Sequence, residues 1–262
     1  MNQTEKKIFF PKSKIIIELF GVMVLTYLGC WATIFKDINL LNQTGVGLTQ
    51  GLVLTIFTYL AYDISGAIFN PAITLGLALI QKFDWTKALF YIAAQFLGGI
   101  IGTGFIFIQM NESLADKLKS KSILGIPMPS NPNYGNSCFW AELFGSFMFT
   151  YIFMDLIFHN KEKNSKLIGA PALGIFYFLS IVTIGEISGS GLNPARSIGP
   201  AVVNGSFGYI QFVHLFGSTF GCVLSTVIYN SVFIDGEFDE KDPVPAKTAV
   251  EYDKAKKEIE LH

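Results

Sequence analysis

Long apolar stretches alternate with short polar ones along this chain, and six of the stretches approach the length of a membrane-crossing helix. A helix needs about 20 apolar residues to cross the hydrocarbon core of a bilayer. The pattern predicts spans at 15–35, 46–62, 86–108, 138–158, 168–185 and 208–230. It therefore predicts an all-α integral membrane protein with six transmembrane helices.

Two further apolar segments, 70–80 and 193–202, are too short to cross, and each begins with Asn-Pro. Asparagine caps the free amides at a helix start, and proline suits the first helical position because it has no amide hydrogen to leave unpaired. Each segment is therefore expected to be a re-entrant half-helix that starts inside the membrane. Non-helical backbone at that depth is tolerated only where it is buried in protein or lines a watery cavity.

The two halves of the chain repeat one another. ELFGVMVLTY at 18–27 matches ELFGSFMFTY at 142–151, and SGAIFNPAITLG at 65–76 matches SGSGLNPARSIG at 188–199. Each half holds three spans, an odd number, so the second half must be inverted in the membrane relative to the first. The two half-helices then enter from opposite faces, and their amino ends meet near the midplane. Inverted repeats with broken helices are a recognised plan for moving solutes across membranes.

The polar ends of the chain complete the expected organisation. A channel domain at 15–230, made of repeats 15–108 and 138–230, lies between an N-terminal segment at 1–14 and a C-terminal tail at 231–262. Positive charge prefers the cytoplasmic side, which places both termini in the cytoplasm together with a set of lysines: Lys6, Lys7, Lys12, Lys14, Lys82, Lys87, Lys161, Lys163 and Lys166.

The outer side carries fewer basic residues but is not free of them. It holds Lys36 and the run 115–122, so the charge bias is imperfect. Three Asn-x-Ser/Thr triplets also face outward, and the sequence leaves their glycosylation open: Asn42, Asn111 and Asn204. The long outer loop at 109–136 is a candidate to cover the outer mouth.

Composition narrows the class of function. Hydrophobic residues make up 51% of the chain and charged residues 15%, against about a quarter charged in soluble domains. With 19 basic and 20 acidic residues, the chain offers no basic surface for nucleic acid. Cys30, Cys138 and Cys222 lie in apolar runs with no metal or disulfide spacing, so packing is their expected role and no metal or cofactor is implied. No catalytic motif such as His-Glu-x-x-His or Gly-x-Ser-x-Gly is present, so an enzyme is not expected.

Arg196 directly follows the second Asn-Pro-Ala and is the candidate residue for excluding ions. A charge among apolar spans is costly unless it faces water or a partner. Two facing helix starts place about half a positive charge each at the midplane. The guanidinium adds a full charge and several donors, so a passage here would oppose cations while it binds neutral polar solutes. Structural pairing of Arg196 with an acid is the alternative.

The chain resembles the major intrinsic protein family, the aquaporins and aquaglyceroporins, over about 12–230. The resemblance rests on the two Asn-Pro-Ala boxes in an internal repeat, the paired Glu-Leu-Phe-Gly segments and the six-span layout. The resemblance implies six tilted helices around a pore, two half-helices that complete a pseudo-helix, and a homotetramer with one pore per subunit. It implies that the two Asn-Pro-Ala boxes, here called the pore boxes, line the pore, and that the amide of each box's asparagine donates to a passing solute. The pore boxes consist of Asn70, Pro71, Ala72, Asn193, Pro194 and Ala195. It also implies that Glu18 and Glu142 accept hydrogen bonds from the loop backbone.

The resemblance further implies a selectivity filter made of Gln50, Ile181, Ser190 and Arg196. Water channels of the family typically have an aromatic at the first of these positions and histidine at the second, and glycerol channels typically have aromatics at the first and third. This chain has neither arrangement, so we expect a wider opening, similar to plant tonoplast-type members. We therefore expect a passive channel for water, with ammonia and urea as further neutral solutes.

Two alternatives to that function stay open. One is an aquaglyceroporin-type glycerol facilitator. The other is a secondary transporter, which would need ion-binding residues at the midplane, where this chain has neutral Asn-Pro-Ala boxes. A plasma membrane and a vacuolar-type membrane are both compatible with the sequence, and gating is not indicated by it.

Several other residues are expected to support the loops and the packing. Asp63 and Glu186 precede the two half-helices and are expected to bind loop amides. Small residues in membrane spans allow helices to approach closely, and this role is expected of four glycines: Gly21, Gly98, Gly145 and Gly217.

Overall fold

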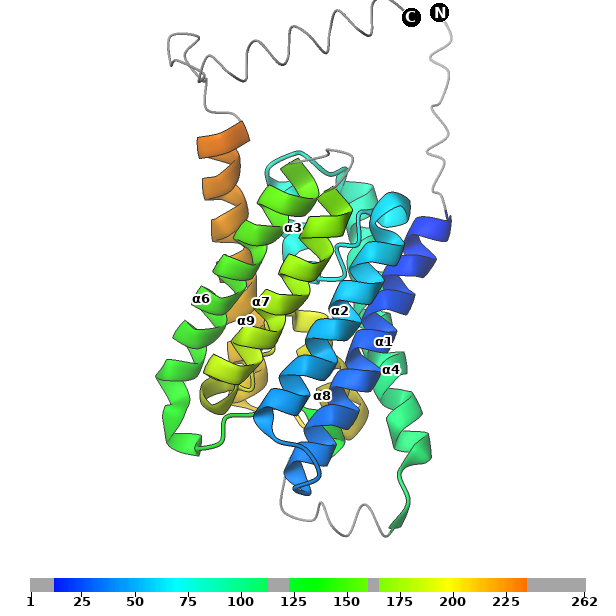
Figure 1. Ribbon diagram of the computed structural model, residues 1–262, viewed down its shortest axis with the longest axis vertical. Helices are drawn as coiled ribbons and strands as arrows, with labels where there is room; N and C mark the ends of the chain where they lie inside the picture. Colours follow the sequence, from blue (N-terminus) through cyan, green and yellow to red (C-terminus); the bar gives the residue numbers. More distant parts are fainter. Residues whose placement is uncertain (1–11, 113–122, 160–164, 235–262) are drawn as a thin grey trace, which may run out of the picture. The chain divides into compact units, whose positions relative to one another are not determined.

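The computed structural model describes residues 12–112, 123–159 and 165–234, and within these ranges it contains helices and no strand (Figure 1). The chain divides into two units, 1–229 and 230–262. Of the second unit the structure describes one π-helical turn, η4, Asn230–Ile234. The expected N-terminal segment up to residue 11, the run 115–122, Lys161, Lys163 and the tail from residue 235 lie outside the described residues.

The six expected spans are present as helices. They are long and apolar enough to cross a membrane, which confirms the predicted fold class. Their bounds are α1 Lys12–Asp37, α2 Gln43–Ser65, α4 Trp85–Gln109, α6 Gly135–Phe153 with the π-helical turn η3 Met154–His159, α7 Ser165–Ser188 and α9 Tyr209–Tyr229. The first span begins at Lys12 and the fourth at Gly135, three residues earlier than the pattern predicts in each case.

Two short helices follow the Asn-Pro pairs as predicted: α3, Pro71–Leu79, and α8, Pro194–Asn204. The loops that lead into them repeat the same backbone conformation. Ala67 and Phe69 have φ of 50° and 49°, and Ser190 and Leu192 have the same two values. Left-handed φ at non-glycine residues costs energy and persists only where the surroundings impose it. Its recurrence at equivalent places shows that the repeat extends to the backbone.

The helices pack as two equivalent sets. α1 lies along α4 in the first repeat as α6 lies along α9 in the second, and α2 packs against α7 between the repeats. Glycines permit these close approaches. A Cβ on Gly98 of α4 would lie 2.3 Å from the Leu19 carbonyl oxygen of α1, and one on Gly221 of α9 would lie 2.2 Å from that of Leu143 of α6.

Two of the glycines expected at helix crossings have a different role. A Cβ on Gly21 would lie 2.2 Å from the ring of Phe69, and one on Gly145 would lie 2.7 Å from Leu192. Phe69 and Leu192 are the residues that precede the two pore-box asparagines. These glycines therefore make room for the re-entrant loops, because the loops fill the space between the long helices.

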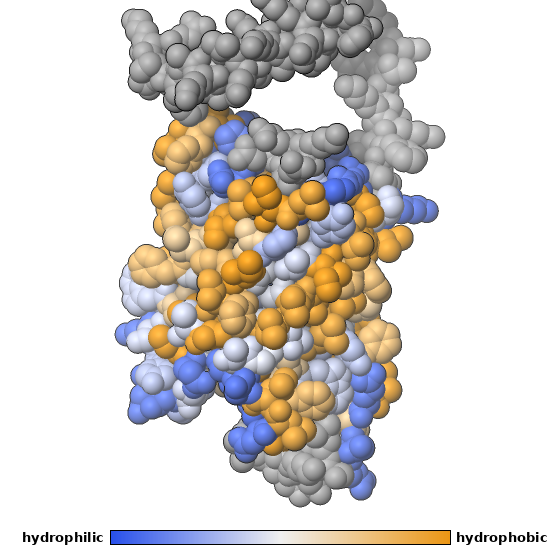
Figure 2. Space-filling model, viewed as in Figure 1, coloured by the Kyte–Doolittle hydropathy of each residue, from blue (hydrophilic) through white to orange (hydrophobic). Residues whose placement is uncertain are grey.

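The outer surface of the helices is apolar. Figure 2 shows apolar side chains over much of one face, with most of the strongly hydrophilic ones toward its two ends. Phe144, Phe212, Phe216 and Phe220 are each about half exposed or more. Such a surface would be unstable in water and is suited to contact with lipid.

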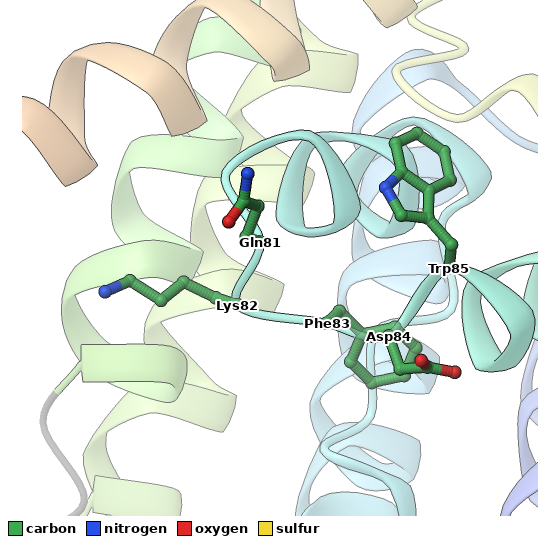
Figure 3. Close-up of a pocket in the computed structure, with 5 residues that line it drawn as sticks. All are labelled: Gln81, Lys82, Phe83, Asp84 and Trp85. Carbon is green, nitrogen blue, oxygen red and sulfur yellow. The ribbon is translucent and has the colours of Figure 1, made fainter.

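An open hollow lies at the turn between α3 and α4 (Figure 3). Its volume is about 530 Å³, and it is lined by five consecutive residues, Gln81 to Trp85. In Figure 3 the side chains of Lys82 and Asp84 extend in different directions instead of converging on one point. None of the predicted site residues borders this hollow, so it is not the candidate functional site.

Candidate functional site

The two half-helices meet at their amino ends, joined by reciprocal hydrogen bonds. Asn70 Nδ2 donates to the Leu192 carbonyl at 3.0 Å, and Asn193 Nδ2 donates to the Phe69 carbonyl at 2.7 Å. Each asparagine therefore binds the backbone of the residue that precedes the other. One hydrogen of each side-chain amide is used in this way, which leaves the second as a donor.

The side-chain carbonyl oxygens of the same two asparagines cap the half-helices. Asn70 Oδ1 accepts from the Ala72 amide at 3.0 Å, and Asn193 Oδ1 accepts from the Ala195 amide at 3.0 Å. Pro71 and Pro194 occupy the first helical positions, where a missing amide hydrogen costs nothing. The Asn-Pro-Ala sequence thus starts each helix and fixes the orientation of its asparagine in one step.

A narrow cavity lies at this meeting point. The space open to the centre of a water molecule is about 10 Å³, close to what a single water requires. Two asparagines and apolar side chains from both repeats form its wall: Leu25, Leu54, Ile68, Phe69, Asn70, Phe149, Tyr177, Leu192 and Asn193. The cavity therefore suits one small polar molecule, held by few polar groups between otherwise apolar walls.

Arg196 lies in the first turn of α8 and is only 2% exposed. Its Nε donates to Gln50 Oε1 at 3.4 Å, and its Nη1 donates to the Gly125 carbonyl at 3.3 Å. Within the described ranges no carboxylate forms an ion pair with it. The guanidinium is therefore held by neutral acceptors and keeps its full charge uncompensated. Structural pairing with an acid, the alternative weighed from the sequence, is not observed in these ranges.

The four predicted filter residues come from four segments, and hydrogen bonding joins two of them. Gln50 of α2 contacts Arg196 of α8 as described. Ile181 of α7 and Ser190 of the loop before α8 are 1% and 2% exposed. Among the described residues neither is hydrogen-bonded to Gln50 or Arg196. The Ile181 carbonyl instead accepts from Gln43 Nε2 at 2.7 Å.

Glu18 and Glu142 hold the two re-entrant loops in equivalent ways. Glu18 accepts from the amides of Ile68 at 3.0 Å and Phe69 at 2.7 Å. Glu142 accepts from the amides of Gly191 at 2.9 Å and Leu192 at 2.8 Å. Each carboxylate also accepts from a serine hydroxyl, Ser65 at 2.5 Å and Ser188 at 2.6 Å respectively. Burial of a carboxylate is costly, and hydrogen bonds from several donors offset that cost.

A third span in each repeat adds a partner that the sequence reasoning missed. Gln95 Nε2 of α4 donates to Glu18 Oε2 at 2.7 Å. His214 of α9 stands at the equivalent place, with Nε2 at 2.7 Å from the Ser188 carbonyl and 3.6 Å from Glu142 Oε1. The signal was available, because QFLGGIIG at 95–102 aligns with HLFGSTFG at 214–221.

The structure corrects the expected roles of Asp63 and Glu186. Asp63 pairs with the Lys166 ammonium at the start of α7, and the loop amides bind Glu18 instead. The backbone carbonyl of Glu186 accepts from both the amide and the hydroxyl of Ser130, at 3.0 and 2.9 Å. Through Ser130 the described part of the outer loop contacts the end of α7, and through Gly125 it contacts Arg196. No sequence motif marks Gly125, because only its backbone takes part.

Comparison with known proteins places the chain beside membrane channels. The family model described as major intrinsic protein matches residues 5–229. Aquaporin NIP1-1 of Oryza sativa subsp. japonica is 31% identical over 226 residues, which cover 84% of this chain and 74% of that protein. Nodulin-26 of Glycine max is 26% identical over 224 residues, which cover 84% of this chain and 77% of that protein.

A solved structure shares the fold. The X-ray structure of the aquaglyceroporin from Plasmodium falciparum matches with a TM-score of 0.74 and 24% sequence identity. The match covers 86% of this chain and 97% of that one. At this identity the likeness shows the arrangement of the helices and does not bear on the solute.

Proposed function

The chain belongs to the major intrinsic protein family, whose members are passive channels and not enzymes, and from this premise we propose that it conducts water together with small neutral solutes such as ammonia and urea. The observation that carries the proposal is the pair of reciprocal asparagine bonds with a cavity of about 10 Å³ between them. A cavity of this size admits solutes one molecule at a time.

Exclusion of ions follows from the charges that face this path. The amino ends of α3 and α8 each contribute about half a positive charge, and Arg196 adds a full charge without an acidic partner in the described ranges. A cation, hydronium included, meets this field without its hydration shell and is opposed, whereas a neutral molecule is not. The free amide hydrogens of Asn70 and Asn193 orient the oxygen of a central water, which interrupts a proton-conducting chain of waters.

The solute range is proposed from the filter residues. Gln50, Ile181, Ser190 and Arg196 include no aromatic ring, so the opening at this level is wider than one lined by aromatics. Among the described residues the Gln50 amide nitrogen has no hydrogen-bond partner, which leaves it as a donor for a passing solute. The filter thus offers polar contacts to ammonia and urea without the aromatic wall that would favour the carbon backbone of glycerol.

The setting of the channel is also proposed. The chain forms a homotetramer with one pore per subunit, in a plasma membrane or a vacuolar-type membrane, with both termini in the cytoplasm. The described lysines near the starts of α1, α4 and α7 support this orientation. Lys166 pairs with Asp63, so the start of α7 and the end of α2 share one end of the helices, and positive charge prefers the cytoplasmic side.

Stopped-flow light scattering on vesicles that contain the purified protein tests the function. We expect osmotic water flux well above that of empty vesicles, with a low activation energy and no need for an ion gradient. We expect urea and ammonia fluxes above background as well. Glycerol flux larger than urea flux would favour the glycerol facilitator, and flux that depends on an ion gradient would favour a secondary transporter.

Replacing Gln50 tests the assignment of the filter. The Gln50→Phe change places an aromatic ring in the opening, so urea flux is expected to fall more than water flux. The exposed Leu52 of the same helix provides the matched control, because Leu52→Phe adds the same ring on the outer surface of α2 and should alter neither flux. Equal loss of water and urea flux in Gln50→Phe, at normal protein content, would contradict a role of Gln50 in selection.

A further inference from the structure

Gln50 lies against a helix position that has no side chain. Gly29 of α1 faces it so closely that a Cβ added to Gly29 would stand 2.9 Å from Gln50 Cδ, 3.0 Å from Oε1 and 3.1 Å from Cγ. The first of these contacts is shorter than real Cβ atoms show and the other two are tight, so a side chain at position 29 would force the side chain of Gln50 to shift.

The same oxygen also faces the filter. Gln50 Oε1 accepts from Arg196 Nε at 3.4 Å, so it stands between the backbone of α1 and the guanidinium. Gln50 is buried, with 3% exposure. A push from the α1 side would therefore move its amide toward Arg196 and into the opening that the filter residues surround.

The internal repeat indicates that glycine is not simply required here by the fold of the helix. At the constant offset that relates 18–27 to 142–151, Gly29 corresponds to Phe153, a large residue that is 2% exposed. Glycine inside a helix is also less favourable than alanine, because it loses more backbone freedom on folding. The second repeat places a phenylalanine at this point, and the first repeat leaves a recess.

We propose that Gly29 is a positioning residue for the selectivity filter: its missing side chain lets Gln50 lie back against α1, and this sets the width of the filter and the range of solutes it passes. The inference rests on the proposed function, since it concerns the filter of that channel. Gly29 itself does not contact the solute. It acts through Gln50 and through the bond of Gln50 to Arg196.

The test compares water and urea fluxes of Gly29→Ala with those of the unmodified protein in the same vesicles. We expect urea flux to fall on the order of tenfold, the scale set by forcing one methyl group into a filled site. Water flux is expected to fall much less, because water is the smaller molecule. The ratio of urea to water flux is the readout, and it is independent of the amount of active protein.

Two further variants separate this role from a general loss of structure. Gly104→Ala makes the same change within α4 at a position where an added Cβ meets nothing within 4 Å, so its flux ratio should equal that of the unmodified protein. The double variant Gly29→Ala/Gln50→Ala removes the displaced side chain and should restore the urea flux. A defect of folding would not be rescued in this way.

The outcomes distinguish the inference from the function on which it rests. If the unmodified protein passes neither water nor urea, the proposed function fails. If it passes both and Gly29→Ala leaves the ratio unchanged, or if the double variant does not raise the ratio again, the role of Gly29 is refuted while the function stands.

Discussion

At the scale of single residues, two carboxylates show how charge is accommodated in the interior of a membrane protein. Glu18 and Glu142 have no exposed surface. A buried ion is costly unless it is fully hydrogen-bonded, and each of these accepts from two loop amides and a serine hydroxyl. The bonds fix the backbone of both re-entrant loops, so each carboxylate acts as structural support for the Asn-Pro-Ala box that follows its loop.

The change Glu18→Gln tests this support. Four donors point at the Glu18 carboxylate, including Gln95 Nε2 and the Phe69 amide. A glutamine replaces one acceptor oxygen by a donor nitrogen, which must then face another donor. We expect the free energy of unfolding to fall by about 2 kcal/mol, the range for hydrogen bonds to charged groups. A lower melting temperature of the detergent-solubilised protein is the measurement.

The exposed Glu112 provides the control for that change. Glu112→Gln removes the same charge without removing a buried acceptor and should leave the melting temperature where it was. A melting temperature unchanged in Glu18→Gln would show that the loop is held by other contacts.

At the scale of helices, the packing of α2 against α7 joins the two repeats and carries two of the filter residues. The backbones meet at paired glycines. A Cβ on Gly51 would lie 2.5 Å from the Gly174 carbonyl oxygen, and one on Gly174 would lie 2.4 Å from that of Gly51. Small residues permit such contact, and van der Waals packing is a main source of helix association within lipid. The separation of Gln50 from Ile181, two residues of the proposed filter, therefore depends on this crossing.

Adding a methyl group at the crossing should separate the helices. The Cβ of Gly174→Ala would meet Thr55 Oγ1 as well as the Gly51 backbone, and backbone atoms cannot move aside alone. We expect a loss of about 2 kcal/mol of stability, typical of overpacking, seen as a lower melting temperature or a lower yield of folded protein. Gly104→Ala should be neutral in the same assay, and a Gly174→Ala variant as stable as the unmodified protein would contradict the crossing described here.

At the scale of the whole molecule, the inverted repeat determines which ends of the helices share a side of the membrane. The start of α1, the end of α2 and the starts of α4 and α7 lie at one end of the helices. The turn between α1 and α2 lies at the other end. Lys12, Lys14, Lys87 and Lys166 are at the first end, and the preference for positive charge inside is the basis for the proposal that this end faces the cytoplasm.

Single cysteines placed at the two ends test this orientation. The native cysteines are all buried, so a membrane-impermeant maleimide applied to intact cells should not label the unmodified protein. Leu40→Cys, at a residue 69% exposed in the turn between α1 and α2, should be labelled from outside. Lys87→Cys, on the exposed surface of α4, should be labelled only after the membrane is opened. The reverse result would place the termini outside.

Much of this architecture could be predicted from the sequence because its signals are local and strong. Apolar length predicted the spans, Asn-Pro predicted the starts of α3 and α8, and the offset between the repeats predicted that these starts meet. The contact of Arg196 with Gly125 and the role of Asp63 were not predictable. Gly125 binds through its backbone carbonyl, which every residue has, and Asp63 pairs with a lysine about a hundred positions later in the chain.

The spans, the inverted repeat, the channel family and the candidate pore residues could all be predicted from the sequence, since each follows from hydrophobic length or from a repeated motif. How these residues contact one another became clear from the packed helices alone. The recess at Gly29, the bond of Gln50 to Arg196 and the crossed asparagine bonds all depend on distances between helices far apart in the chain. Such distances are set by how side chains from several helices pack together, and the residues of one segment do not specify this.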